Sequence, residues 1–336
     1  MLSALAWAVV TLLLLAVQPV QCACQPSARA SQPPVAAPPA PAPSVAAPSR
    51  RAPPTLSWEV VEVRPHDPDA WTQGLQLDGQ GRLFESTGLR GRSSVREVDA
   101  ASGAVRRQVA LPKRHFGEGL AIVGDRLIQL TWQEGVANVW DAETFDRIDT
   151  FDFDGEGWGL CYDGRRLVMS DGSQRLTFRD PATFEVMGTL EVDGGTLPPL
   201  RLNELECVGD TVWANAWLTD TIVRIDPQGG RVTGVLDLAG LLEQWGPGPD
   251  APAAPEPPDV LNGIAWDAAV GTFLVTGKRW PALFEIRVAE ESVASEPPNV
   301  PQGRLAPDRG ACYPAKGTRG RPGTSSRVRK RLPANG

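Results

Sequence analysis

One unit repeats five times along the middle of this chain, from about residue 61 to residue 288, and it restricts the fold more than any other feature. Each copy opens on a short motif, and successive copies are separated by about 45, 40, 46 and 58 residues. The motifs are TQGL at 72–75, GEGL at 117–120, GWGL at 157–160, NELE at 203–206 and NGIA at 262–265. Such a period is typical of folds in which one small unit stacks on copies of itself.

Within each copy, a turn and a second apolar run follow the motif, and in four copies a third run ends before a turn such as ASG, AET, PAT or PQG. A fourth run closes four of the five copies. Short alternating runs between Gly, Asp and Pro turns predict four antiparallel strands for each copy. Four such strands in about 45 residues are the signature of one propeller blade.

The sequence therefore predicts an all-β fold, a five-bladed β-propeller with four-stranded antiparallel blades. The fifth copy stops after three strands, so we expect the segment SWEVVEVR at 57–64 to supply its outer strand and close the ring. Closure of this kind removes open sheet edges. An unclosed stack of repeats is the alternative, but the sequence lacks the polar capping repeats that it needs.

The two ends of the chain differ from the repeat. Residues 1–28 carry no charge, and the apolar run at 4–17 is typical of a secretory signal, with Cys24 as a candidate for lipidation. We divide the chain into a signal peptide or lipoprotein signal at 1–24, a disordered Pro/Ala-rich linker at 25–55, the propeller at 56–290 and a disordered basic tail at 291–336. We therefore expect an exported protein, periplasmic or secreted; lipidation at Cys24 would give it an N-terminal membrane anchor, and simple cleavage of the signal nearby is the alternative.

Composition argues against nucleic-acid binding and against a structural zinc site. The formal net charge is −7, and an acidic propeller is unsuited to binding nucleic acid. The only two histidines are His66 and His115, and no zinc-type cysteine pairs occur in the repeat, which argues against a structural zinc site built from these side chains. We expect a monomer.

Glu85 is the most unusual residue of the repeat, because it interrupts the apolar run LFEST at 83–87. Burial there is expected to raise the pKa of its carboxyl toward the range of a general acid-base. A structural carboxylate that binds blade-closing amides is the alternative. Lys278 ends the corresponding run of the last copy, so the two can meet beside the channel, as catalytic groups or as a structural ion pair. Gln73 and Asn203 lie in the inner motifs and offer amide donors, although an Asn before a strand is commonly a turn residue.

Tryptophans gather near the same motifs. The sequence has 11 Trp against 2 Tyr. Each of those near the motifs either packs between blades or contributes to an indole-lined pocket at one mouth of the channel. These residues are Trp71, Trp132, Trp158, Trp213, Trp217, Trp266 and Trp280.

The strings WTQGL, LFESTGLRGRSSVREV, FGEGL, RLNELE and FLVTGKRWP, with others between them, resemble the plant (papaya-type) glutaminyl cyclases and their bacterial relatives. The resemblance runs through every blade in register, from about residue 62 to residue 288. It implies a five-bladed propeller, in agreement with the repeat. It also implies a glutaminyl-peptide cyclotransferase, which converts the N-terminal glutamine of peptides or proteins to pyroglutamate and releases ammonia.

The resemblance further implies roles for individual residues. It makes Glu85 the general acid-base and places Lys278 and Asn203 around the substrate carboxamide. The substrate-binding residues that it implies are Gln73, Trp71, Trp132 and Trp217, with Trp71 in place of the phenylalanine usual before TQG. No cofactor is required for this chemistry, although the family holds a structural metal ion, for which calcium and zinc are the candidates, in the channel. No ligand for that ion can be named from this sequence.

Three alternatives stay open. A non-catalytic propeller would bind peptides or proteins at the channel mouth and would tolerate loss of Glu85. A hydrolase-type propeller would bind a channel calcium through several acids, but the inner motifs contain few Asp. Cys161 and Cys207 follow the motif at equivalent positions of neighbouring copies, and we expect two buried thiols rather than the disulfide that an oxidising compartment would allow.

Overall fold

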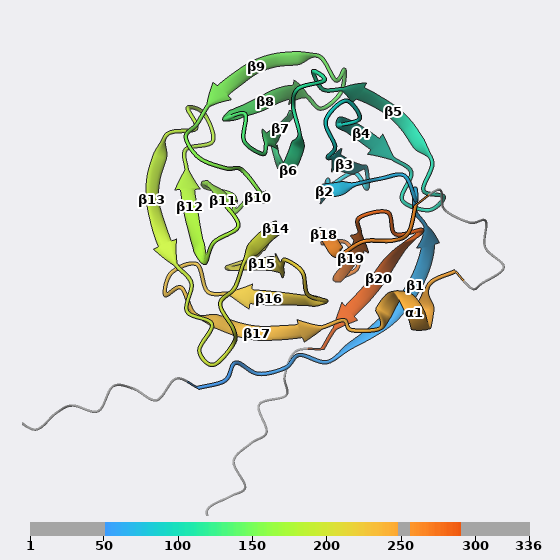
Figure 1. Cartoon of the computed structure of the whole chain (residues 1–336), viewed down its shortest axis with the longest axis vertical. Helices are drawn as coiled ribbons and strands as arrows, with labels where there is room; N and C mark the ends of the chain where they lie inside the picture. Colours follow the sequence, from blue (N-terminus) through green and yellow to red (C-terminus); the bar gives the residue numbers. More distant parts are fainter. Residues whose placement is uncertain (1–50, 248–255, 290–336) are drawn as a thin grey trace, which may run out of the picture. The chain divides into compact units, whose positions relative to one another are not determined.

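The computed structural model describes residues 51–247 and 256–289, which form five four-stranded antiparallel sheets arranged as a ring (Figure 1). In each sheet the strand that carries the repeated motif lies nearest the centre, and the other strands follow outward. The predicted five-bladed β-propeller is therefore confirmed, with one blade for each copy of the repeat.

The blades share one order of strands. The inner strands are β2 (Thr72–Leu77), β6 (Gly117–Val123), β10 (Leu160–Tyr162), β14 (Leu202–Val208) and β18 (Leu261–Asp267). The second strands are β3 (Leu83–Thr87), β7 (Arg126–Thr131), β11 (Leu167–Ser170), β15 (Thr211–Ala216) and β19 (Thr272–Gly277). The third strands are β4 (Ser94–Val98), β8 (Val136–Asp141), β12 (Arg175–Arg179), β16 (Thr221–Ile225) and β20 (Ala282–Val288). The outer strands are β5 (Val105–Ala110), β9 (Arg147–Asp152), β13 (Val186–Glu191), β17 (Val232–Asp237) and β1 (Trp58–Pro65), and one short helix, α1 (Leu241–Trp245), follows β17.

The last blade is completed by the beginning of the described chain. β1 pairs antiparallel with β20, from Trp58 opposite Val288 to Pro65 opposite Ala282. The predicted closure of the ring by an N-terminal strand is therefore confirmed, and this strand begins and ends one residue later than expected. The pairing satisfies backbone groups that a three-stranded blade would leave open.

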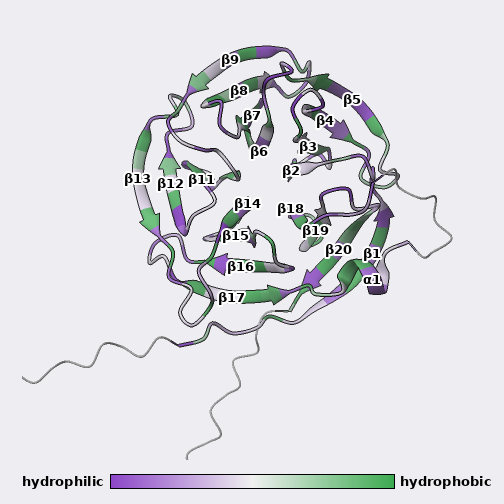
Figure 2. Cartoon of the chain, in the orientation of Figure 1, coloured by the Kyte–Doolittle hydropathy of each residue, from purple (hydrophilic) through white to green (hydrophobic). Residues whose placement is uncertain are grey.

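Apolar side chains fill the spaces between neighbouring sheets. The described residues contain five clusters of buried apolar side chains, and each joins two neighbouring blades. One of them brings Phe84 of β3 against Trp140 of β8. The outer strands β5, β13 and β17 alternate in exposure along part or all of their length, and Figure 2 shows hydrophilic and hydrophobic segments alternating around the rim. Burial of one Leu or Phe side chain is worth roughly 1.5–3 kcal/mol, so stacking of the blades is a main source of stability.

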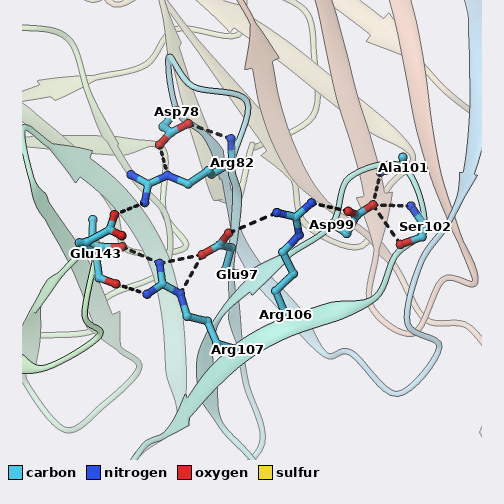
Figure 3. A network of polar contacts seen from close by, with 10 residues as sticks. Asp78, Arg82, Glu97, Asp99, Ala101, Ser102, Arg106, Arg107 and Glu143 are labelled. Atoms are coloured by element: carbon cyan, nitrogen blue, oxygen red, sulfur yellow. Dashed lines mark hydrogen bonds and ion pairs between the residues drawn. The ribbon is translucent and has the colours of Figure 1, made fainter.

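Ion pairs reinforce the contact between the first two blades at the rim (Figure 3). Arg107 of β5 donates to Glu97 of β4 at 2.8 Å, and its guanidinium carbon lies 4.3 Å from the ring centroid of Phe145. Arg82 reaches Glu143 of the next blade at 2.8 Å. Exposed pairs such as that of Arg82 with Glu143 contribute about 0–1 kcal/mol each, so they support the apolar contact rather than replace it.

A disulfide joins the inner strands of the third and fourth blades. Cys161 of β10 and Cys207 of β14 are bonded, with their Cα atoms 5.5 Å apart. The expectation of two buried thiols is therefore wrong. The inner strands of neighbouring blades lie side by side around the channel, and this brings the two Cα atoms within the distance that a disulfide requires.

The predicted signal, nearly all of the linker, most of the Pro-rich insert and the basic tail lie outside the described residues. Among the helices of residues 51–247 and 256–289, none has the length and apolar character needed to cross a membrane.

Candidate active site

The inner strands share an irregularity at one position of the repeat. In four blades the pairing between the inner and second strands shifts there, as in a β-bulge. The residues at this position are Gln73, Glu118, Asn203 and Asn262, and all four are buried. The third blade carries Trp158 at the equivalent position, just before β10 begins. A bulge bends its strand and redirects a side chain, so it can place polar groups where a regular strand would place apolar ones.

Three of these side chains form a hydrogen-bonded row across the fifth, first and second blades. The amide nitrogen of Asn262 donates to Oε1 of Gln73 at 3.0 Å, and the amide nitrogen of Gln73 donates to Oε1 of Glu118 at 3.0 Å. Asn262 also donates to the backbone carbonyl of Thr72 at 3.0 Å. The row therefore fixes the Gln73 amide with its donor toward the carboxyl of Glu118.

Glu118 has the properties of a general acid-base. Its Oε2 atom is buried and has no hydrogen-bond partner among the described residues. Burial raises the pKa of its carboxyl well above the usual range, the charges of Glu134 and Glu156 add to this shift, and Lys278 opposes it. A carboxyl whose pKa is raised in this way can accept and donate a proton nearer neutral pH.

Lys278 supplies a positive charge beside Glu118. It directly follows β19, is buried, and places its ammonium nitrogen 5.4 Å from the ring centroid of Trp71. Burial lowers the pKa of Lys278, and the negative charge of Glu118 counters that shift. The expected meeting of Lys278 with Glu85 does not occur, because the ion-pair partners of Glu85 are Arg96 and His66.

Asn203 lies at the same level of the repeat on β14. Its Oδ1 atom is buried without a partner among the described residues, and its backbone carbonyl accepts a hydrogen bond from Ser170 at 2.7 Å. Within the described part of the chain no hydrogen bond connects its side chain to Gln73 or Glu118. Asn203 thus occupies the same position of the repeat as Gln73 and Glu118, but its side chain is not part of their hydrogen-bonded row.

Aromatic side chains stand in two neighbouring pairs beside these polar groups. Phe116 packs edge-on against Trp132 with ring centroids 5.6 Å apart, and Trp158 packs edge-on against Trp217 with centroids 5.4 Å apart. The indole N–H groups of Trp132 and Trp158 both donate to Oε2 of Glu156, at 2.8 and 2.9 Å. These four half-buried rings, from Phe116 to Trp217, form an aromatic arc that spans several blades.

Trp71 extends the aromatic arc at its Phe116 end. A Cβ atom at Gly88 would lie 2.4 Å from the Phe116 ring and 2.8 Å from the Trp71 ring, so both rings pack against this glycine and no larger residue fits. Arg279 lies over Trp71, with its guanidinium carbon 4.7 Å from the ring centroid. Trp71, Trp132 and Trp217, which the resemblance makes substrate-binding residues, thus lie in one row of side chains in which Glu156 joins Trp132 to Trp158.

Glu85 lies elsewhere, inside the first blade. Its Oε1 accepts a hydrogen bond from Thr72 at 2.7 Å and lies 3.2 Å from Nε2 of His66, and its Oε2 accepts from Arg96 at 2.8 Å. Burial would raise the pKa of Glu85, but the charges of Arg96 and His66 outweigh it and lower this pKa below its usual range. The expectation of a raised pKa is therefore wrong, and the contacts favour the alternative of a structural carboxylate.

Glu204 and Glu206 of β14 link three blades across the channel. Glu204 accepts the backbone N–H groups of Leu75 and Ile264 at 3.2 and 2.8 Å, and Glu206 accepts a hydrogen bond from the side chain of Gln76. Burial raises the pKa of Glu204 well above its usual range and raises the pKa of Glu206 to about 8. In neutral solution these carboxyls act mainly as internal cross-links.

The expected channel metal finds no set of side chains to hold it. The described residues contain no group of three or more His, Cys, Asp or Glu side chains that could bind a metal ion. All four carboxyl oxygens of Glu204 and Glu206 accept hydrogen bonds from the protein. In this part of the chain, His, Cys, Asp and Glu side chains alone therefore form no calcium or zinc site.

Sequence reasoning missed Glu118, Asn262 and Glu156 as site residues. The first two could have been found by comparing the second residue of TQGL and GEGL with the equivalent residues of the other motifs, because that residue is polar in four copies. Glu156 lies in the connection between β9 and β10, and no repeat position marks it.

Known proteins are similar to this chain over the whole propeller. A family model described as glutamine cyclotransferase matches residues 34–288. A glutaminyl-peptide cyclotransferase of Arabidopsis thaliana is 41% identical over 242 residues, which cover 70% of this chain and 73% of that protein. The crystal structure of Myxococcus xanthus glutaminyl cyclase matches with a TM-score of 0.61 and 38% identity, covering 70% of this chain and 98% of that one.

Proposed function

The chain belongs to the glutamine cyclotransferase family, and from this premise we propose that Glu118 is the general acid-base of its active site. The protein is a glutaminyl-peptide cyclotransferase, which closes the N-terminal glutamine of a peptide or protein to pyroglutamate and releases ammonia. The proposal concerns which side chains carry out this reaction.

The reaction forms a bond between the α-amine nitrogen and the δ-carbon of one glutamine and breaks the bond from that carbon to the amide nitrogen. One proton must leave the attacking amine, and one must reach the departing nitrogen. Oε2 of Glu118 takes the first proton and delivers it to the departing nitrogen, so the carboxyl returns to its initial state and ammonia leaves. Oε1 remains bonded to Gln73, which keeps Oε2 directed toward the substrate.

Negative charge develops on the carbonyl oxygen as the amine attacks, and fixed positive or donor groups at that point accelerate the reaction. Lys278 offers an ammonium group near Glu118, and Asn203 offers an amide at the equivalent position on β14. We propose that these two side chains polarise the carbonyl. Gln73 acts through Glu118, because its amide already binds that carboxyl.

The aromatic arc and Trp71 provide apolar surface for the methylene groups of the glutamine. A substrate folded so that its amine approaches its own amide loses rotational freedom, and a fitted pocket supplies that order in advance. Trp132 and Trp217 are therefore proposed to bind substrate, together with Phe116 and Trp158 that pack against them.

The observation that carries the proposal is the buried Oε2 of Glu118 without a partner among the described residues, in a carboxyl whose pKa is raised. Glu118→Gln keeps the size of the side chain and removes proton transfer. We expect it to lower kcat about a hundredfold or more, measured as ammonia released from a Gln-initiated dipeptide.

Glu85→Gln is the matched comparison, because it changes the other buried glutamate in the same way. We expect this variant, where it folds, to keep turnover within a few-fold of wild type. Wild-type turnover in folded Glu118→Gln, together with loss of turnover in folded Glu85→Gln, would return the acid-base role to Glu85. A wild-type protein that releases no ammonia would leave the non-catalytic peptide-binding propeller as the better description.

We also propose that the protein is exported. The apolar run at 4–17 supports this, as does the disulfide between Cys161 and Cys207, since disulfides persist in oxidising compartments. Fractionation of cells that produce the full chain tests the proposal. An uncleaved chain that stays in the cytoplasmic fraction would contradict it.

A further inference from the structure

One carboxylate joins the two halves of the aromatic arc. Glu156 precedes β10, and its Oε2 atom accepts the indole N–H groups of both Trp132 and Trp158. Its Oε1 atom accepts a hydrogen bond from the Gln133 side chain at 2.9 Å. Trp132 and Gln133 follow the second blade's β7 and Trp158 precedes the third blade's β10, so the side chain of Glu156 connects two blades.

The carboxylate lies at the centre of a symmetric arrangement. From Glu156, one direction leads through Trp132 to Phe116, and the other leads through Trp158 to Trp217. Each indole is thus held at its N–H by Glu156 and packed against an aromatic neighbour at its edge. A ring held in both ways has one orientation, whereas a ring with a free N–H can rotate about its side-chain bonds.

Guanidinium groups lie over the outer rings of the arrangement. The guanidinium carbon of Arg90 lies 5.4 Å from the ring centroid of Trp132, and that of Arg201 lies 3.9 Å from the ring centroid of Trp217. Arg90 is itself bound to Glu134 at 2.7 Å. The charged group that acts on Glu156 itself is Asp171, which opposes its ionised form, whereas the three hydrogen bonds from Gln133, Trp132 and Trp158 favour that form.

We propose that Glu156 is a positioning residue of the active site, which holds Trp132 and Trp158 in the orientation that receives the substrate glutamine and adds a negative charge to the surroundings of Glu118. The proposal rests on the function and site proposed above. It assigns to Glu156 no proton transfer and no contact with the reacting atoms.

The electrostatic part of the role has a defined sign. The hydrogen bond from Gln133, with those from the two indoles, lowers the pKa of Glu156, so this residue is ionised at neutral pH. The charged groups that act on Glu118 are Lys278, which favours its ionised form, and Glu134 and Glu156, which oppose that form. Loss of the Glu156 charge therefore lowers the pKa of Glu118.

Two variants of one residue separate the two parts of the role. Glu156→Gln retains an oxygen that both indoles can bind, and the Gln133 amide can turn to bind its nitrogen, so only the charge is lost. Glu156→Ala removes the acceptor as well. Asp154→Asn is the matched control, because Asp154 is an exposed acid of the same connection and makes no hydrogen bond to the arc.

The measurements are kcat and KM for a Gln-initiated dipeptide between about pH 5 and 9. We expect Glu156→Ala to raise KM about tenfold or more, because the indole N–H groups of Trp132 and Trp158 lose their hydrogen-bond acceptor. We expect Glu156→Gln to keep KM within about threefold of wild type and to move the acid limb of the kcat profile to lower pH by roughly half a unit or more. The amine of the free substrate titrates identically with every variant, so the kcat/KM profiles are compared as well, because they report the free enzyme and the free substrate.

The outcomes distinguish this inference from the site proposal. Wild-type KM in Glu156→Ala and an unmoved acid limb in Glu156→Gln, with Glu118→Gln inactive, would overturn the role of Glu156 alone. Full activity of Glu118→Gln would overturn the proposal that Glu118 is the general acid-base. An equal effect of Asp154→Asn would show a general response to surface charge and would also reject the inference. Thermal unfolding of each variant checks that the propeller is intact, and Glu156→Gln keeps the test decisive if Glu156→Ala fails to fold.

Discussion

The side-chain amide of Gln73 donates to Oε1 of Glu118 at 3.0 Å, and Oε2 of the same carboxyl has no partner among the described residues. One oxygen is therefore held and the other is left for the substrate. Asn262 holds the oxygen of Gln73 in turn, so the orientation of the catalytic carboxyl depends on a row of two amides from two neighbouring blades.

Replacing Gln73 with Met tests this row. The variant fills similar space but cannot donate to Glu118, so we expect kcat to fall roughly ten- to hundredfold while KM changes less, because the carboxyl loses its fixed direction. Steady-state kinetics with a Gln-initiated dipeptide measure both constants. Asn262→Ala should also lower kcat, since without Asn262 the side-chain amide of Gln73 is free to rotate. An effect of Gln73→Met on KM alone would instead make Gln73 a substrate-contacting residue.

Replacing Lys278 with Met tests the positive charge. Lys278 opposes the raised pKa of Glu118, so its loss should raise that pKa further and move the acid limb of the kcat profile to higher pH, opposite to Glu156→Gln. We also expect kcat to fall about a hundredfold, because the developing oxyanion loses a cation. Thermal unfolding measured in parallel should change little, since burial of the ammonium is costly and a methionine of similar length avoids that cost. Coincident loss of stability and activity would instead give Lys278 a structural role.

Replacing Glu85 with Gln is expected to affect stability rather than chemistry. Arg96 and His66 face this carboxylate inside the first blade, and a buried cation without its partner costs about 3–5 kcal/mol. Urea denaturation measures the loss. Because the pKa of Glu85 is lowered in the folded protein, its contribution is present above about pH 4.5 and is lost as the pH falls through the folded pKa. Stability unchanged by the substitution would show that the ion pairs are dispensable.

For Glu206 we expect the opposite pH dependence of the free energy of unfolding. Its pKa is raised to about 8 by burial, so the folded protein keeps a proton that the unfolded chain releases near pH 4.5. Between these values the free energy of unfolding should fall by about 1.4 kcal/mol for each pH unit from this group, and the loss should be complete above the folded pKa. Denaturation curves across this range, compared between wild type and Glu206→Gln, measure the difference. Equal slopes in the two proteins would exclude this contribution.

The disulfide gives a further stability prediction. Cys161 and Cys207 are separated by 46 residues, and a cross-link that closes a loop of this length stabilises a domain by about 4 kcal/mol in the chain-entropy description. Denaturation with and without a reductant should show a loss in this range. A Cys161→Ser, Cys207→Ser double variant should match the reduced wild type and should not respond to reductant.

Sequence reasoning reached the fold because a blade is a local unit. Its strands follow one another along the chain, so turns and alternating runs report the pairing directly, and the short fifth copy revealed the closure by 57–64. The site depended on contacts between blades, which local patterns do not report. Glu85 stood out because it interrupts an apolar run, yet its partners His66 and Arg96 come from outside that run, and only their charges show that the carboxyl is structural.

Glu118 was overlooked for the opposite reason. It lies between two glycines in a motif that looks like part of the frame, whereas its function follows from the bulge that redirects it and from Gln73 on the neighbouring blade. Glu156 is harder still, because its partners Trp132 and Trp158 are set by the loops of two blades and nothing in the local sequence pairs them.

The pairing of β1 with β20 also orders events in time. A ribosome makes the first strand of the ring long before it makes the last, so β1 must wait unpaired while the intervening blades are synthesised. The four strands of each intervening blade can pair as soon as they have been synthesised. The ring itself can close only when β20 is available to pair with β1. Completion of the enzyme is therefore tied to the end of the propeller's synthesis. A chain that stops before β20 leaves β1 and β19 without their partner strand, and such unpaired edges can pair with other chains.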